Sequence, residues 1–251
     1  DKMRERGVTP NVISFSAAIS ACEKAGKWER ALSLLHEMRE RSVAPNVISF
    51  SAAISACEKG GQWERALSLL DEMRERGVTP DVISFNAAIS ACEKGGKWER
   101  ALSLLDEMRE RGVTPDVISF SAAISACEKG RQWERALSLL EEMRTRHGIA
   151  PTAVTYNVLM QALAASGRVE EGFALLRDFE AAGLADTAES YSVHRTLLEA
   201  CRASGTAAQV NRVQTAINRR GLSALAAVAY STYGGEQLRF TNADFLTKET
   251  R

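Results

Sequence analysis

The sequence predicts an all-α fold, a right-handed α-solenoid in which antiparallel helix-turn-helix repeats stack into a superhelix. Two observations lead to this prediction. A unit of 35 residues recurs along the chain with few changes, and each copy contains two successive segments with helical apolar periodicity. Units of this kind bury their apolar faces only against neighbouring units, so they form an extended stack without a central core.

The copies divide the chain into four classes of segment. Four copies are nearly identical, and the fourth is one residue longer because His147 is inserted before Gly148. Two diverged copies follow, and the first residues of the chain match the end of another copy, "DKMRERGVTP" against "DEMRERGVTP". The predicted division is 1–11 for the end of a truncated upstream repeat, 12–46, 47–81, 82–116 and 117–152 for the near-identical repeats, 153–221 for the diverged repeats and 222–251 for a C-terminal tail.

Local signals place two helices in each copy. In the second copy Asn46 follows a proline and is a favourable N-cap. The first helix is therefore expected over residues 47–59, where Gly60 ends it, and the second over residues 63–76, before Gly77. Apolar residues on the second helix recur at helical spacing, which predicts one buried face and one solvated, charged face. In the first copy the predicted buried stripe contains Trp28, Ala31, Leu32, Leu35 and Met38.

The first helix of each copy has two distinct faces. One is apolar and is expected to be buried, and in the first copy it consists of Phe15, Ala18, Ile19 and Cys22. The other face repeats an isoleucine, two small polar residues and a lysine, which suits a ligand with one planar base and one phosphate per step. The alternative interpretation is a solvent-facing surface that binds nothing. This stripe contains Ile13, Ser16, Ser20 and Lys24, then Ile48, Ser51, Ser55 and Lys59, then Ile83, Asn86, Ser90 and Lys94, then Ile118, Ser121, Ser125 and Lys129.

Features shared by the repeats resemble the pentatricopeptide repeat family, of the P class with uniform units. They are an aromatic residue at the fourth position, a glycine at the fifteenth, a penultimate proline and the second-helix motif "ERALSLLDEM". Tetratricopeptide repeats are similar but carry their tryptophan early in the first helix. Here a tryptophan opens each second helix, at Trp28, Trp63, Trp98 and Trp133.

The resemblance implies that the chain binds single-stranded RNA with one base per repeat. In this family the fifth and last residues of a repeat select the base, the second residue packs between bases, and a lysine near the thirteenth position approaches a phosphate. By position, the base-selecting residues are Ser16, Asn46, Ser51, Asp81, Asn86, Asp116, Ser121 and Asn157, the base-stacking residues are Ile13, Ile48, Ile83, Ile118 and Val154, and the phosphate-contacting residues are Lys24, Lys59, Lys94 and Lys129. The first three pairs, Ser16 with Asn46, Ser51 with Asp81 and Asn86 with Asp116, imply adenine, guanine and uracil in turn.

A comparison between two copies supports this assignment. Repeats 47–81 and 82–116 differ only at Ser51 versus Asn86 and at Gln62 versus Lys97. One of these two differences falls on a base-selecting position, as expected where neighbouring repeats read different bases.

Other residue types indicate no catalytic function. The cysteines recur at one position of the first helix, on its apolar face, so we expect buried apolar residues and no metal site. The histidines share no spacing with carboxylates or thiols that would form a catalytic set, and no phosphate-binding glycine motif is present. We therefore expect no enzyme activity, no cofactor and no small-molecule substrate. No apolar run reaches the length of a membrane span, so no membrane insertion is expected.

Two functions remain open on the sequence alone. The first is sequence-selective RNA binding in organellar RNA processing, stability or translation, with a chloroplast or mitochondrial location implied by the resemblance. The second is a non-enzymatic scaffold or accessory subunit of a large organellar assembly, such as a ribosome or photosynthetic complex. The second is favoured by the equal numbers of basic and acidic residues, 32 each, and by apolar residues in the tail. Such a scaffold would contact protein through its convex face or through the tail.

Overall fold

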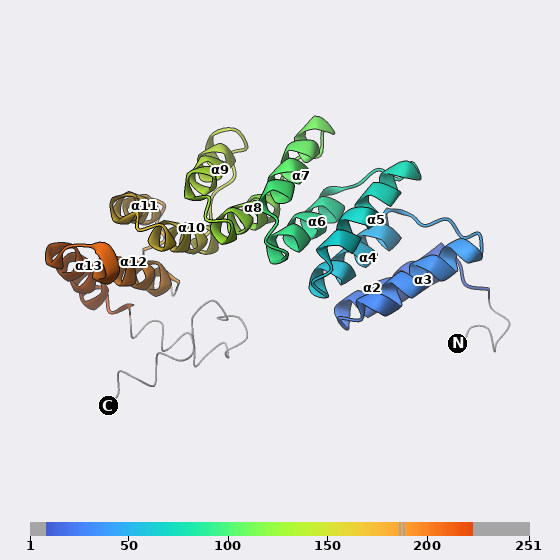
Figure 1. Cartoon of the computed structure of the whole chain (residues 1–251), viewed down its shortest axis with the longest axis horizontal. Coiled ribbons are helices and arrows are strands. Elements are labelled where there is room, and N and C mark those ends of the chain that lie inside the picture. Colours follow the sequence, from blue (N-terminus) through green and yellow to red (C-terminus); the bar gives the residue numbers. More distant parts are fainter. Residues whose placement is uncertain (1–8, 186, 188, 223–251) are drawn as a thin grey trace, which may run out of the picture. The chain divides into compact units, whose positions relative to one another are not determined.

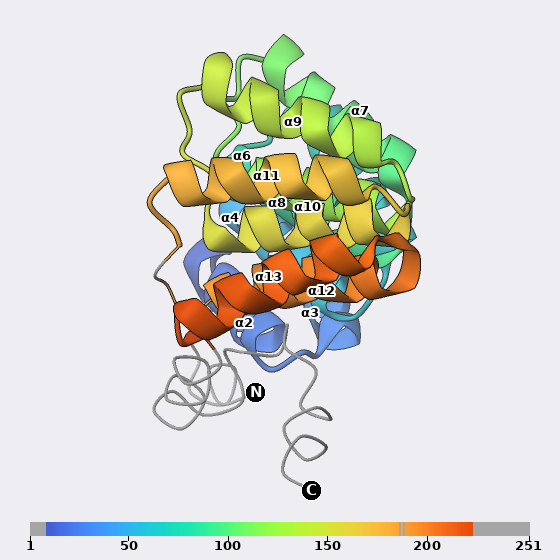
Figure 2. The same ribbon diagram turned by 90° about the vertical axis from the view of Figure 1, so that its left-hand side faces the viewer.

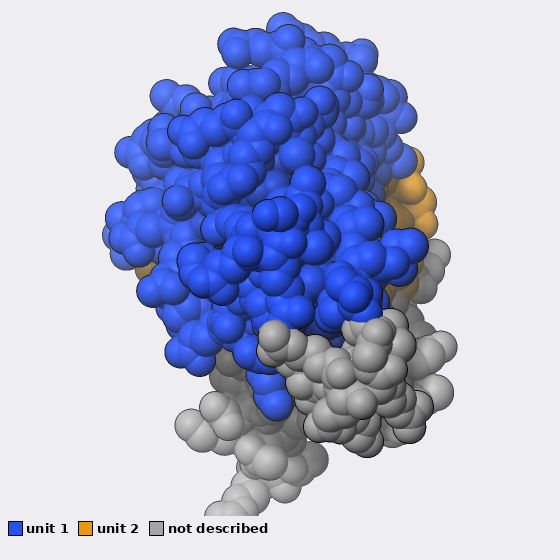
Figure 3. All heavy atoms as spheres, turned by 90° about the vertical axis from the view of Figure 1, so that its right-hand side faces the viewer, with its two compact units in different colours: residues 1–150 blue, residues 151–251 orange. Residues whose placement is uncertain are grey.

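The computed structural model describes residues 9–185, 187 and 189–222, and within these residues all regular structure is helical. The predicted tail beyond Leu222 and residues 1–8 of the predicted upstream repeat end therefore lie outside the described residues. The chain divides into two compact units, residues 1–150 and 151–251, coloured separately in Figure 3. Each unit is built of paired helices labelled in Figure 1, and the predicted all-α solenoid fold is confirmed.

The first unit consists of two layers of helices. Its first-layer helices are α2 (Val12–Lys24), α4 (Val47–Lys59), α6 (Val82–Lys94) and α8 (Val117–Lys129), and each packs directly on the next. Its second-layer helices are α3 (Trp28–Glu40), α5 (Trp63–Glu75), α7 (Trp98–Glu110) and α9 (Trp133–Thr145). Each second-layer helix packs on the first helix of its own repeat, and α3, α5 and α7 also pack on the first helix of the following repeat.

The second unit has the same arrangement over two repeats. It contains α10 (Ala153–Ala165), α11 (Val169–Ala181), α12 (Ser190–Ser204) and α13 (Ala207–Arg219). Within it α10 contacts both α11 and α12, and α10 and α11 run side by side in Figure 2. The diverged copies therefore keep the helix-pair architecture.

Each first-layer helix of the first unit begins at an Asn or Asp cap. Asn46 accepts a hydrogen bond from the Ser49 backbone amide at 3.0 Å, and the Ser49 hydroxyl accepts one from the Asn46 amide at 3.2 Å. This reciprocal pair satisfies two amides that the helix itself leaves unbonded. The predicted bounds of α4 are confirmed, whereas α5 ends at Glu75, one residue earlier than predicted.

The apolar faces form a continuous core between the two layers. Phe15 and Ile19 of α2 are buried, as are Ala31, Leu35 and Met38 of α3. The predicted stripe of α3 is wrong at two positions, because Trp28 and Leu32 are only half-buried, and it omits Leu34, which is buried. The reason is that α3 packs on both α2 and α4, so its buried face is wider than one neighbour would produce.

A tryptophan–glycine contact joins successive repeats of the first unit. A Cβ atom added to Gly60, the C-terminal cap of α4, would lie 2.2 Å from Cδ1 of Trp28. The same close approach recurs between Gly95 and Trp63 and between Gly130 and Trp98. Glycine at this position therefore allows the indole of one repeat to pack against the first helix of the next.

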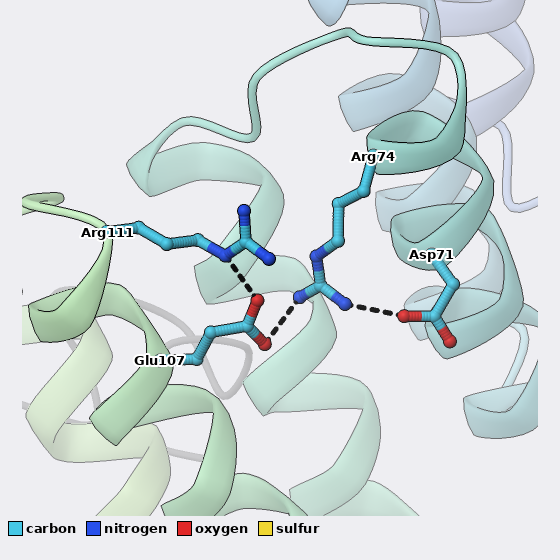
Figure 4. Close-up of polar contacts among 4 residues, drawn as sticks. All are labelled: Asp71, Arg74, Glu107 and Arg111. Atoms are coloured by element: carbon cyan, nitrogen blue, oxygen red, sulfur yellow. Dashed lines mark hydrogen bonds and ion pairs between the residues drawn. The ribbon is translucent and has the colours of Figure 1, made fainter.

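Ion pairs connect the second-layer helices. Arg74 of α5 contacts Glu107 of α7 at 2.6 Å, and Arg74 also contacts Asp71 while Arg111 contacts Glu107 (Figure 4). Equivalent pairs across repeats are Arg39 with Glu72 and Arg109 with Glu142. Because Arg74, Arg109 and the three glutamates each have at least two partners, these pairs form a network rather than isolated surface salt bridges.

The turn after each first-layer helix requires a left-handed backbone. Gly61 has φ of +68°, and the following amide of Gln62 bonds back to the Cys57 carbonyl at 2.9 Å, as in a Schellman motif. In the fourth repeat the glycine is displaced by one position, and Arg131 takes this conformation with φ of +55°. A side chain with a Cβ atom is strained in this region.

We expect Arg131→Gly to stabilise the protein by about 0.5–1 kcal/mol, since relief of about 1–2 kcal/mol of left-handed strain is partly offset by glycine's greater unfolded-state entropy. The reciprocal change Gly61→Arg should destabilise it by a similar amount. Thermal unfolding followed by circular dichroism measures both. Arg131→Ala is the control, because it removes the long side chain and keeps the Cβ atom. An equal gain from Ala and Gly would contradict the backbone explanation.

We also expect the cysteines to differ in reactivity. Burial raises the pKa of Cys57, Cys92 and Cys127 to about 11, so on the order of one thiol in a thousand is ionised at pH 8. Cys22 is only half-buried. Alkylation of the native protein should therefore modify Cys22 first, and the other three only after unfolding. The four tryptic peptides differ in sequence, so mass spectrometry identifies each site. Equal labelling of all four would show that the first layer opens readily.

Candidate nucleic-acid interface

The first-layer helices present a row of exposed aliphatic side chains. Among the described residues the exposed large hydrophobic side chains are Ile13, Ile48, Ile83, Ile118 and Val154, between 48% and 73% exposed. These are the five residues that the sequence analysis places at the base-stacking position, the second residue of each first-layer helix. A large hydrophobic side chain left in solvent once per repeat, on a helix whose other large hydrophobic side chains are not exposed, is typical of a binding surface.

The two members of each predicted base-selecting pair meet in space. Ser16 lies 3.5 Å from Asn46 Oδ1, Ser51 lies 3.4 Å from Asp81 Oδ1, and Asn86 donates through Nδ2 to Asp116 Oδ1 at 3.1 Å. Each pair joins the middle of one first-layer helix to the N-cap of the next. Side-by-side packing of these helices therefore brings together residues that are 30 positions apart.

The pair members differ in exposure. Ser16, Ser51 and Asn86 are at most 9% exposed, whereas Asn46, Asp81 and Asp116 are half-buried. The helix residue thus lies at the base of each junction and the N-cap residue at its rim. The polar stripe that the sequence predicts on the first helix of each repeat is therefore not uniformly exposed to solvent. Ser121 is half-buried and Asn157 is buried, and their role in selecting a base stays a prediction.

A third side chain, a serine that the sequence analysis did not identify, lies at each junction. Ser49, Ser84 and Ser119, the third residues of α4, α6 and α8, are completely buried. They lie 2.6–2.9 Å from Ser16, Ser51 and Asn86 respectively. The capping-box position was a signal that could have identified them, because a serine there lies within reach of the N-cap side chain.

The carboxylate at the third junction is held in its charged form. Burial alone would raise the pKa of Asp116, but hydrogen bonds from Ser119, Asn86 and the Ile118 amide outweigh it, and the pKa of Asp116 is lowered. The group is therefore ionised at neutral pH and acts only as an acceptor.

The predicted phosphate-contacting lysines are paired across repeats. Lys59 contacts Glu23, Lys94 contacts Glu58 and Lys129 contacts Glu93, each at 2.5 Å. The lysine side chains remain 42–44% exposed, while the glutamates are 15–20% exposed. Lys24, in the first repeat, is exposed. To bind an anion, a lysine on this face must therefore break its ion pair with the glutamate or contact the glutamate and the anion together.

The second unit contains a related contact. Asn157 of α10 accepts a hydrogen bond through Oδ1 from the Ser192 hydroxyl of α12 at 3.1 Å. His194, two residues further along α12, is buried, and burial lowers its pKa. Its ring nitrogen Nδ1 lies 2.8 Å from the Ser190 carbonyl oxygen, so it contributes to the packing of this helix.

The described residues contain no group of three or more His, Cys, Asp or Glu side chains placed to hold a metal ion. Within the same part of the chain, every helix is too short or too polar to cross a lipid bilayer.

Stacked helix pairs with one polar junction, one exposed aliphatic residue and one lysine per repeat define a helical-repeat protein with a periodic binding face. The sequence matches the family profile described as pentatricopeptide repeat domain over residues 1–60, 33–97, 68–130 and 103–165, and the profile described as PPR repeat over residues 154–184. The chain belongs to the pentatricopeptide repeat family, as the sequence predicts. No curated protein sequence matches it.

Solved structures share this fold. The pentatricopeptide repeat protein PPR10 from maize is 26% identical with a TM-score of 0.64, and the match covers 87% of this chain and 31% of that one. PPR10 in complex with an 18-nucleotide psaJ RNA element is 20% identical with a TM-score of 0.54, covering 91% and 39%. The PPR domain of Arabidopsis thaliana protein-only RNase P 1, in complex with tRNA, is 15% identical with a TM-score of 0.55, covering 80% and 96%. The chain thus spans 31–39% of the length of the maize protein structures.

Proposed function

We propose that this chain binds single-stranded RNA along its first-layer helices, one base per repeat. The observation that carries the proposal is the junction between successive first-layer helices, where Asn86 and Asp116, 30 residues apart, share a hydrogen bond directly beside the exposed Ile118. The maize protein and the RNase P domain, which share its fold, are solved in complex with RNA.

At each junction, the hydrogen-bonding groups that helix capping does not use are complementary to a different base. Asn46 Oδ1 accepts from Ser49, which leaves the Nδ2 amide as a donor suited to adenine N1. Asp81 Oδ1 accepts from Ser84, which leaves Oδ2 as an acceptor suited to the N1–H and N2–H groups of guanine. The third junction offers both an amide donor and a carboxylate acceptor, which suits the O4 and N3–H groups of uracil. These are the bases that the family resemblance implies.

The remaining groups of each repeat suit the rest of a nucleotide. The exposed isoleucines supply apolar surface on which a base packs, and such packing tolerates any base. Each lysine supplies a cation for a phosphate, which fixes register and carries no sequence information. Selectivity therefore lies in the junctions.

We place the protein in an organelle, chloroplast or mitochondrion, on the basis of the family, with a role in RNA processing, stability or translation. In this proposal the repeats act without catalysis. They select the RNA, and any reaction on it is supplied elsewhere.

The proposal predicts selective binding to RNA with an A-G-U core. A single-stranded RNA that contains this core should bind more tightly than RNAs in which each of the three bases is replaced in turn, since a mismatch leaves buried polar groups unpaired. Fluorescence anisotropy at low salt measures the affinities. Equal affinity for all baits would exclude base selection, and no binding at low salt would exclude the proposed function.

The lysine–glutamate pairs predict that Glu58→Gln strengthens RNA binding. The change releases Lys94, and because an exposed ion pair contributes about 0.2–1 kcal/mol, the affinity should rise by a factor of about 1.5 to 5. Anisotropy titrations over a range of salt concentrations measure both affinity and salt slope, which should steepen by up to about 0.7.

The matched control for that variant is Glu75→Gln. Glu75 is exposed on a second-layer helix, so its neutralisation changes the net charge equally. The same gain from Glu75→Gln would assign the effect to overall charge and not to the release of Lys94.

The lysine–glutamate pairs also favour a second function, that of a scaffold subunit in an organellar assembly. They neutralise the face that would otherwise attract RNA. A scaffold would co-purify with its complex after nuclease treatment and show no salt-sensitive RNA binding, whereas the RNA-binding proposal predicts salt-sensitive binding by the isolated chain.

A further inference from the structure

Ser49, Ser84 and Ser119, hereafter the bridging serines, occupy the centre of the three junctions. Each is the third residue of its helix, and its side chain is completely buried. A buried hydroxyl needs hydrogen-bond partners, because an unpaired polar group inside a protein is costly. The partners here are the two residues of a base-selecting pair, one on each side.

The bridging serine at the third junction contacts both members of its pair. The Ser119 hydroxyl lies 2.6 Å from Asn86 Oδ1 and 3.1 Å from Asp116 Oδ1, and it accepts from the Asp116 amide at 3.0 Å. It therefore connects the helix residue of one repeat to the N-cap residue that ends the same repeat.

These contacts fix the orientation of the Asn86 amide. The Asp116 carboxylate is ionised and only accepts hydrogen bonds, so the group of Asn86 that faces it is the Nδ2 donor. Oδ1 of Asn86 then faces Ser119, which donates to it. A flipped amide would place oxygen against carboxylate and nitrogen against a hydroxyl already bonded to the cap.

The same hydroxyl group also fits a serine at the base-selecting position. Ser84 donates to Asp81 Oδ1 at 2.7 Å, and its oxygen lies 2.8 Å from the hydroxyl of Ser51. Because a hydroxyl both donates and accepts, Ser84 is able to receive a hydrogen bond from Ser51 at the position where Ser119 gives one to Asn86. One residue type at the third position thus serves both kinds of pair.

We propose that the bridging serines are positioning residues that set base selectivity, by holding each selecting pair in one hydrogen-bonding arrangement before RNA binds. This inference rests on the proposed RNA-binding function and adds a residue to it. A preset donor and acceptor pattern rejects a mismatched base, since the pair does not reorient to accommodate it. In the second unit the Ser192 hydroxyl likewise donates to the amide oxygen of Asn157, which repeats one of the two contacts of a bridging serine.

The test is Ser119→Ala, measured with four RNAs that carry U, A, C or G at the base read by Asn86 and Asp116. The preference for U over the other bases should fall about tenfold, while the salt slope and the selectivity at the first two bases stay unchanged. Ser119→Thr keeps the hydroxyl and should keep the preference. Threonine is accommodated at this position, because Thr155 forms the same capping box in α10.

Ser14→Ala is the matched control. Ser14 forms the same capping box with Asn11 at the start of α2, and its hydroxyl hydrogen bonds are with Asn11. This variant therefore loses an equivalent helix cap and should keep full selectivity. If Ser119→Ala unfolds the protein, Ser84→Ala tests the same role at the second junction, with G as the favoured base.

The outcomes separate the two proposals. Selective binding by the unaltered chain together with unchanged selectivity in Ser119→Ala would overturn the role of the bridging serines and leave the proposed function standing. An equal loss in Ser14→Ala and Ser119→Ala would also overturn it, because helix capping alone would explain the effect. Absence of selective RNA binding by the unaltered chain would overturn both.

Discussion

Each repeat of this protein completes its core only with its neighbours, and this constraint determines the rest of the structure. A helix pair alone leaves one apolar face in water, so α3 must pack on α4 as well as on α2. The contact repeats between near-identical units, and the spacing of the units is therefore the same at every step. A periodic ligand needs such a spacing, and the tryptophan–glycine contact from Trp28 to Gly60 helps to maintain it.

The candidate site uses the same packing. Its polar groups are the N-cap of one first-layer helix and a side chain from the middle of the preceding one, so a junction forms wherever two such helices lie side by side. In the proposed complex, helix capping and base recognition therefore use the same side chain. Asp116 caps α8 through Oδ1, which leaves Oδ2 as the acceptor for the proposed ligand. This sharing makes the site rigid, since moving the selecting group would also uncap the helix.

Most of the fold was predictable from local signals, and much of the site was not. The bounds of α4 follow from Asn46 and Gly60, which act within a few residues of themselves. Burial of Leu34 rather than Leu32 depends on a second neighbouring helix, which periodicity along one helix does not reveal. The pairing of Lys59 with Glu23 was equally hidden, because the sequence places a glutamate directly before each predicted phosphate-contacting lysine, whereas the contact forms with the glutamate of the preceding repeat.

The paired lysines change the source of binding free energy in the proposed complex. A lysine that exchanges a glutamate for a phosphate gives up one ion pair to form another, so its net contribution is smaller than that of a free cation. Packing on the isoleucines and hydrogen bonds at the junctions then supply a larger share. Both kinds of interaction form separately in each repeat, so the affinity grows with the number of repeats that bind a base. A wrong base therefore loses a large fraction of the contribution of its own repeat, and the neutral face favours selectivity over affinity.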